Sequence, residues 1–184
     1  MKYRTIVADP PWTLPTHRLG SGGRRKRSTE IPYQFMSLDD IKALPVASLA
    51  EDDAHLFLWC TRKVFREGDA VAVARAWGFE PVGEIVWGLR NPGMGGFIGN
   101  DHEPVLVARR GHAQFTSDIR LGGVHFWRQT YLHGKVHSAK PEAFLDFVEQ
   151  SSKGPYLEMF ARRHRLGWDV HGNESANTAT LDAS

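Results

Sequence analysis

The sequence predicts an α/β fold in which helices cover a mostly parallel central sheet. Two observations support this fold class. Short runs of β-branched and aromatic residues alternate along the chain with segments of helical periodicity. The run at residues 55–60 (HLFLWC) is almost continuously apolar, which is typical of a strand buried on both faces of a parallel sheet. With 184 residues, the chain is long enough to form one domain with a substantial core.

The first predicted strand covers residues 3–8 (YRTIVA), a run rich in β-branched side chains. Pro10 and Pro11 follow it, and they end the strand because proline donates no ladder hydrogen bond. Ser37 is then placed to cap a helix at residues 38–44, whose first turn carries two aspartates.

A second helix is expected after the apolar strand at residues 55–60. Thr61 is in position to cap this helix, and Gly78 is in position to end it. Its buried face is predicted from residues at i, i+3, i+4 and i+7, namely Ala70, Val73, Ala74 and Trp77.

The second half of the chain continues the alternation. Further strands are predicted at residues 84–87, 105–108, 156–160 and 168–170. Pro141 occupies the first position of another predicted helix. The segment at residues 124–136 alternates apolar and polar residues without clear caps, so its structure stays ambiguous.

Composition excludes several classes of protein. Lys+Arg 23 and Asp+Glu 21 leave a net charge of +2, so any surface that binds nucleic acid must be local. Cys60 is the only cysteine, which excludes an internal disulfide and a cysteine-based zinc site and fits a reducing cytoplasm. No apolar run approaches the roughly 20 residues that span a bilayer, so we expect no membrane contact.

Two glycine-rich loops, at residues 13–36 and 91–102, are candidates for contacts with a substrate. The first carries a basic cluster formed by Arg24, Arg25, Lys26 and Arg27. Since no acidic residue lies between Pro10 and Thr29, the cluster is suited to contact phosphates. A solvated loop without a ligand explains the same residues.

The sharpest motif is Asp9-Pro10-Pro11-Trp12, directly after the first strand. The prolines stiffen the backbone, so the Asp9 carboxylate and the Pro10 carbonyl are two fixed acceptors beside the flat indole of Trp12. Two acceptors and a stacking plane suit an aromatic ring that bears an exocyclic amino group. A strand-ending turn with a core tryptophan accounts for the same residues equally well.

This motif resembles that of the adenine-N6 methyltransferases that use S-adenosylmethionine. The form with tryptophan resembles the family that includes messenger-RNA adenosine methyltransferase and its bacterial and phage DNA relatives. The resemblance continues in consistent order through PYQFMS at 32–37, HLFLWCT at 55–61, EIVW at 84–87, NDHE at 100–103, SAKPE at 138–142, YLEMFAR at 156–162, His164 and GNE at 172–174. It therefore covers residues 3–174 and implies a Rossmann-like methyltransferase domain.

The resemblance also implies roles for individual residues. Asp9, Pro10, Pro11 and Trp12 form the catalytic motif, in which Asp9 and Pro10 bind the target amino group. The residues that border the substrate are Trp12, Tyr33, Asn100, His102 and Glu103, together with the basic cluster at 24–27.

The same resemblance implies a cofactor site. Lys140 is expected to reach the methionine carboxylate, and its place before Pro141 at a helix start favours an anion. Arg162, His164, Asn173 and Glu174 are expected to hold the adenosine part, with Asp9 and Phe160 as further cofactor contacts.

The expected function is methyl transfer to adenine N6 in DNA, in the cytoplasm of a bacterium or phage-infected cell. The expected domain spans residues 1–174, with 13–36 as its basic active-site loop and 175–184 as a flexible tail. A homodimer or a specificity partner is possible, since only loops are available to read a sequence. Three alternatives stay open: the same reaction on RNA, a silent nucleic-acid-binding subunit, and a metal-dependent hydrolase that uses Asp9, His102 and Glu103.

Overall fold

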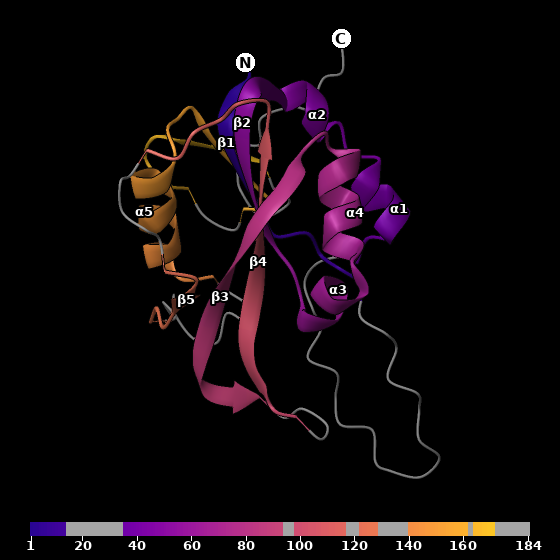
Figure 1. The fold of residues 1–184 in the computed structure, drawn as a ribbon, viewed down its shortest axis with the longest axis vertical. Helices are drawn as coiled ribbons and strands as arrows, with labels where there is room; N and C mark the ends of the chain where they lie inside the picture. Colours follow the sequence, from indigo (N-terminus) through magenta and orange to yellow (C-terminus); the bar gives the residue numbers. More distant parts are fainter. Residues whose placement is uncertain (14–34, 94–97, 117–121, 129–139, 162–163, 172–184) are drawn as a thin grey trace.

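A seven-stranded sheet forms the centre of the protein (Figure 1). The computed structural model describes residues 1–13, 35–93, 98–116, 122–128, 140–161 and 164–171. The strands are β1 (Tyr3–Ala8), β2 (Ala50–Trp59), β3 (Glu80–Gly93), β4 (Asn100–Arg110), β5 (Val124–His125), β6 (Tyr156–Met159) and β7 (Trp168–His171). Their order in the sheet is β5-β3-β4-β2-β1-β6-β7.

The sheet is mostly parallel, as predicted. β1 pairs in parallel with β2 and β6, β6 with β7, and β3 with β5. β4 is the exception, because it runs antiparallel to both β2 and β3. The short connection between β3 and β4 makes them a hairpin, and a hairpin forces the antiparallel direction.

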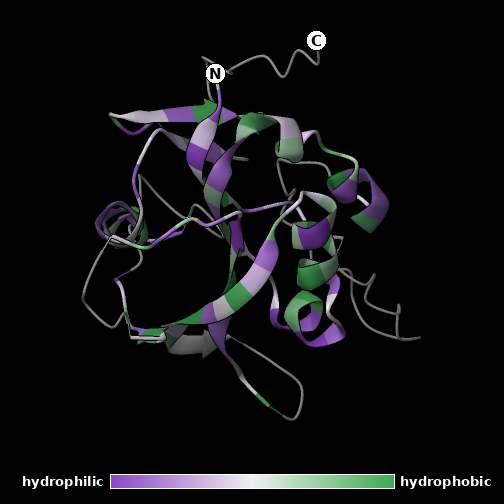
Figure 2. Cartoon of the chain, turned by 45° about the horizontal axis from the view of Figure 1, so that its top comes forward, coloured by the Kyte–Doolittle hydropathy of each residue, from purple (hydrophilic) through white to green (hydrophobic). Residues whose placement is uncertain are grey.

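Helices cover both faces of the sheet (Figure 1). They are α1 (Leu38–Lys42), α2 (Val46–Leu49), α3 (Arg62–Glu67), α4 (Asp69–Ala76) and α5 (Glu142–Ser151). α5 lies on one side of the sheet, and α1, α3 and α4 lie on the other. Hydrophobic and hydrophilic residues both occur along the strands and on the helices (Figure 2).

The central strands are buried on both faces, which gives the protein two cores. Ile6 and Leu58 point toward the core shared with α1, α3 and α4. Val7 and Trp59, the next residues along each strand, point toward the core shared with α5, where they meet Phe144. This alternation explains why the strand at 55–60 reads as continuously apolar rather than alternating.

Several predicted boundaries needed correction. The single helix expected between Thr61 and Gly78 is two helices, because Gly68 adopts a φ of 81° and ends α3 before α4 begins. Thr61 caps α3 as predicted, with its side chain accepting a hydrogen bond from the backbone N–H of Val64. Pro141 is the residue before α5 rather than its first helical residue.

Some strands are longer than predicted, whereas β6 ends one residue earlier than the predicted 156–160. β3 and β4 extend beyond the predicted 84–87 and 105–108, because ladder hydrogen bonds continue through polar residues at both ends. α2 was not predicted. β5 covers the first two residues of the ambiguous segment at 124–136. No helix among the described residues is long and apolar enough to span a membrane.

A buried polar network ties the end of α5 to the sheet. The Thr5 hydroxyl donates to the Lys153 carbonyl at 2.7 Å and lies 2.5 Å from the Ser152 hydroxyl. Ser152 in turn lies 2.7 Å from Nδ1 of His55, whose ring stacks on Phe115. His55 is only 1% exposed, and this burial lowers its pKa to about 4. A hydrogen bond with the backbone of Ala113 raises the pKa, and the positive charge of Arg109 lowers it further.

This network predicts a loss of stability in mild acid. The His55 pKa is lower in the folded protein than in the unfolded chain, so the unfolded state binds the extra proton first as the pH falls below about 6.5. We expect this residue to lower the free energy of unfolding by about 2 kcal/mol between pH 7.5 and pH 5. Urea denaturation at both pH values measures the change.

A matched pair of variants isolates the contribution of His55. His55→Gln removes the titrating group, so its pH dependence should be flatter than that of the original protein. His112→Gln, at an exposed histidine, should leave the pH dependence unchanged. Equal pH dependence in the His55→Gln variant and the original protein would contradict the assignment.

Candidate functional site

Three adjacent parallel strands end at one edge of the sheet and place the candidate site there. Asp9 follows β1, Thr61 comes two residues after the end of β2, and Ala161 comes two residues after the end of β6. Because β2, β1 and β6 are neighbours, these three positions lie side by side, as the alternation of elements predicts. In open α/β sheets this edge is where ligands bind.

The Asp9-Pro10-Pro11-Trp12 motif forms a tight turn that leads away from β1. The backbone N–H of Trp12 donates to the Pro10 carbonyl at 2.8 Å, and the N–H of Met36 donates to the Pro11 carbonyl at 2.9 Å. The Pro10 carbonyl is therefore held rigidly by its own turn. Since a carbonyl oxygen has two lone pairs, it can accept a second hydrogen bond.

Trp12 lies inside the protein rather than on its surface. Its side chain is 6% exposed, and its indole N–H donates to the Trp59 carbonyl at 2.9 Å. The ring packs in the core with α1, α3 and α4. This arrangement favours the packing role that the sequence left open for Trp12, and a base-lining role stays a prediction.

Lys140 is the centre of the charged part of the site. Its ammonium lies 2.7 Å from a Glu103 carboxylate oxygen and 3.5 Å from an Asp9 carboxylate oxygen. It also lies 4.9 Å from the centre of the Trp59 ring. A cation between two carboxylates and over an aromatic face joins the end of β1, the start of β4 and the start of α5.

The electrostatics of Lys140 follow from these contacts. Burial alone would lower its pKa, because its side chain is only 19% exposed and a desolvated charge is disfavoured. The negative charges of Asp9 and Glu103, with their hydrogen bonds, outweigh burial and raise the pKa above its ordinary value. Lys140 is therefore a fixed positive charge at neutral pH.

Glu103 and His102 point to opposite faces of the sheet. Glu103 pairs with Trp87 and reaches Lys140 on the α5 side, whereas His102 pairs with Gly88 and its Nδ1 lies 2.6 Å from Asp101. Neighbouring strand residues alternate in this way, so the two side chains do not converge on one ion. Within the described residues, no three His, Cys, Asp or Glu side chains gather as metal ligands would.

Phe160 follows β6 with a backbone conformation that is uncommon for a side chain of its size. Its φ is 63°, in the left-handed region that favours glycine. The backbone N–H of Phe160 donates to the His171 carbonyl, and the N–H of Ala161 donates to the same oxygen at 3.3 Å. The bend turns the chain at the edge of the sheet, beside the end of β1.

Other predicted site residues are placed less fully. His164 is exposed, and Asn100 begins β4 as the backbone partner of Gly93. The remaining predictions lie outside the described residues: Tyr33, the cluster Arg24, Arg25, Lys26 and Arg27, Arg162, Asn173, Glu174, and the tail at 175–184. Their roles stay predictions.

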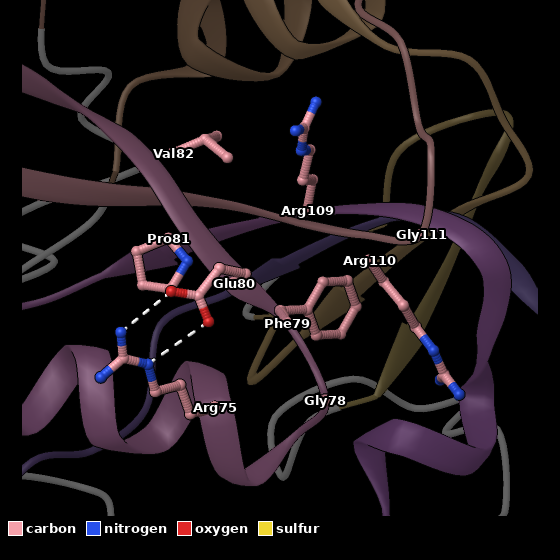
Figure 3. Close-up of a pocket in the computed structure, with 9 residues that line it drawn as sticks. All are labelled: Arg75, Gly78, Phe79, Glu80, Pro81, Val82, Arg109, Arg110 and Gly111. Carbon is pink, nitrogen blue, oxygen red and sulfur yellow. Dashed lines mark hydrogen bonds and ion pairs between the residues drawn. The ribbon is translucent and has the colours of Figure 1, made fainter.

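A separate pocket of about 640 Å³ lies at the other end of β3 and β4 (Figure 3). Arg75 and Glu80 form a two-bonded ion pair at its side, with contacts of 2.9 and 3.4 Å. Arg109 lies six residues from Glu103 along β4, which is about 20 Å in a strand. None of the predicted site residues lines this pocket.

Comparison with known proteins identifies a family and several relatives of this chain. The model of the MT-A70 family matches residues 3–174, nearly the whole chain. The type II methyltransferase M.MunI of Mycoplasma sp is 28% identical over 189 residues, which cover 94% of this chain and 78% of that protein.

Eukaryotic relatives match over a smaller part of their own length. The N(6)-adenosine-methyltransferase catalytic subunit METTL3 of Homo sapiens is 27% identical over 197 residues. That alignment covers 98% of this chain and 30% of METTL3. The N(6)-adenine-specific methyltransferase METTL4 of Homo sapiens is 26% identical, over 94% of this chain and 37% of that protein.

The contact between Lys140 and Glu103 predicts a measurable energetic coupling. A double-mutant cycle with Lys140→Met and Glu103→Gln should give about 1–3 kcal/mol of coupling in urea denaturation, because either single change leaves a poorly solvated charge.

The exposed pair Lys42 and Asp39 provides the matched control. These groups lie 3.8 Å apart, and the Asp39 side chain is 95% exposed, so Lys42→Met and Asp39→Asn should couple by less than about 0.5 kcal/mol. Equal coupling in the two cycles would show that the Lys140 bridge makes no special contribution.

Proposed function

The chain belongs to the MT-A70 family, and on that premise we propose that it transfers a methyl group from S-adenosylmethionine to adenine N6 in DNA. The observation that carries the proposal is the Asp9 carboxylate, fixed by Lys140 beside the rigid Pro10 carbonyl. Two fixed acceptors at the end of a central strand are what an amino group with two N–H donors requires.

The chemistry that these residues perform is positioning. S-adenosylmethionine supplies an electrophilic methyl group on a sulfonium sulfur. Asp9 and Pro10 each accept a hydrogen bond from the amino group of adenine, which favours a tetrahedral nitrogen and aims its lone pair at the methyl carbon. Transfer would leave a positively charged and therefore acidic nitrogen, which would lose its proton afterwards. Asp9 therefore needs no prior deprotonation of the amine.

The residues present fit the cofactor. Lys140 is a largely buried cation at the start of α5, where helix polarity adds to its attraction for an anion. It is suited to hold the methionine carboxylate. Phe160 and His164 come from the segment after β6, next to Asp9 in the sheet order, and we assign them to the adenosine side together with Arg162, Asn173 and Glu174.

We choose DNA as the substrate because of the share of each relative's length that aligns with this chain. The alignment covers 78% of M.MunI but only 30% of METTL3. This fuller match to a bacterial protein favours the bacterial and phage DNA relatives that the sequence motifs resemble, and we therefore propose DNA as the substrate. Residues 1–174 would be the catalytic domain, and the basic loop at 13–36 would contact phosphates, with a second copy or a partner adding specificity.

Two alternatives remain within this architecture, and each has a distinguishing result. The same site on RNA would give N6-methyladenosine in place of its deoxy form. A silent nucleic-acid-binding subunit would give neither product. The intact Asp9-Pro10-Pro11-Trp12 motif argues against it, because a silent copy has no need of a complete amine-binding motif.

Digestion of the products identifies the substrate. Labelled S-adenosylmethionine should transfer its methyl group to duplex or single-stranded DNA, and nucleoside analysis should show N6-methyldeoxyadenosine. Label in RNA alone would replace DNA as the substrate. No label in any polymer, with intact cofactor binding, would contradict the enzymatic proposal for the isolated chain.

A substitution at Asp9 tests the proposed positioning role. Asp9→Ala should lower methyl transfer by about 100-fold or more, because it removes an acceptor aimed at the reacting amine. Cofactor affinity, measured by calorimetry, should change little, since Glu103 still holds Lys140.

Asp39→Asn is the matched control, since that carboxylate is exposed on α1. It should leave both methyl transfer and cofactor affinity unchanged. Loss of cofactor binding in Asp9→Ala would reassign Asp9 to the cofactor alone.

A further inference from the structure

An exposed aromatic ring lies at the same edge of the sheet as the candidate site. In the register of β5 on β3, Val124 pairs with Val86 and His125 pairs with Trp87. Phe126 follows directly and so comes beside Gly88. Gly88 in turn pairs with His102, the neighbour of Glu103.

The ring of Phe126 covers the backbone of β3 at Gly88. A methyl group built on Gly88 would overlap the Phe126 ring, so only a glycine lets the ring come this close. Even so, Phe126 is 64% exposed. One side of the ring therefore rests on the strand, and much of the rest is open to solvent.

Its neighbours along the chain point the other way. His125 and Trp127 stack on each other at 4.2 Å and pack on Phe147 of α5. Trp87 anchors this side by donating from its indole N–H to the Trp127 carbonyl at 3.0 Å. The packing of both neighbours holds the backbone in place, so Phe126 is presented on a rigid support.

The position of the ring relates it to the charged site. Strands in a sheet lie about 4.8 Å apart, so Phe126, at β5 and β3, is three to four strand spacings, roughly 14–19 Å, from Asp9 at the end of β1. At about 3.4 Å per stacked nucleotide, that is the length of roughly four to six nucleotides. Because Gly88 pairs with His102 and Trp87 with Glu103, the ring lies on the opposite face of the sheet from Glu103 and Lys140. Arg128 is exposed and lies two residues further along the chain.

We propose that Phe126 stacks on an unpaired base of the substrate strand, roughly four to six nucleotides from the target adenine, and that the exposed Arg128 contacts phosphate. An exposed aromatic ring next to a cation is the combination that binds single-stranded nucleic acid without sequence preference, because every base has a flat face. The inference rests on the proposed function, and it assigns Phe126 to positioning the strand rather than to methyl transfer itself.

Binding measurements test this role. The probe is a short fluorescein-labelled single-stranded DNA with one adenine, in the presence of S-adenosylhomocysteine. Phe126→Ala should bind it roughly 5- to 150-fold more weakly, whereas Phe126→Trp should bind it as the original protein does. Methyl transfer by Phe126→Ala should show a raised KM and an unchanged kcat.

A second binding measurement uses a DNA probe from which one base has been removed. Removing one base roughly four to six nucleotides from the adenine should weaken binding to the original protein and have little further effect on Phe126→Ala. Val82→Ala is the control, since Val82 is a 45% exposed apolar residue six positions from Gly88 on β3. It should bind both probes as the original protein does, and thermal unfolding should show that both variants fold.

The outcomes separate this inference from the proposed function. Equal probe binding by Phe126→Ala and the original protein, while both methylate adenine, would overturn the stacking role and leave the enzyme assignment intact. Absence of methylation in every polymer would overturn the enzyme assignment, and the binding arms would still decide the stacking role. A dimer that Phe126→Ala converts to a monomer with unchanged probe affinity would show a contact between copies and overturn the inference.

Discussion

Lys140 connects parts of the chain that are far apart in sequence, and the candidate site depends on that connection. Asp9 ends the first strand, Glu103 begins the hairpin strand, and Lys140 precedes the last helix. A largely buried ammonium is unfavourable alone, and two carboxylates crowded together are unfavourable without a cation. Each charge thus requires the others, and together they set where α5 begins relative to β1 and β4.

The direction of β4 brings Glu103 into this arrangement. In a wholly parallel sheet, the first residues of a strand lie at the edge opposite the ligand-binding edge. Because β4 runs antiparallel to β2, its first residues lie where β1, β2 and β6 end. Strand alternation then divides these residues, so that Glu103 faces Lys140 and His102 faces Gly88 and the side on which Phe126 is exposed.

The catalytic motif is rigid, and its acceptor oxygens are held by contacts within the protein. The Pro10 carbonyl is bound within its turn, and the Asp9 carboxylate is bound to Lys140. Each of these oxygens can accept more than one hydrogen bond. Trp12 supports this turn from inside the core. Methyl transfer gains most from fixed geometry, and a turn anchored at both ends supplies it.

Much of the architecture follows from the sequence alone. The apolar run at 55–60 predicts a buried strand, and the prolines after residue 8 predict where the first strand ends and hence which edge carries Asp9. Both follow from the sequence because local periodicity and backbone chemistry act over a few residues. The order of motifs over 3–174 indicates the family. The tertiary structure alone decided that Glu103 meets Lys140, that Trp12 is buried, and that Phe126 is exposed over Gly88. These depend on strand direction and register between distant segments, which no local pattern encodes.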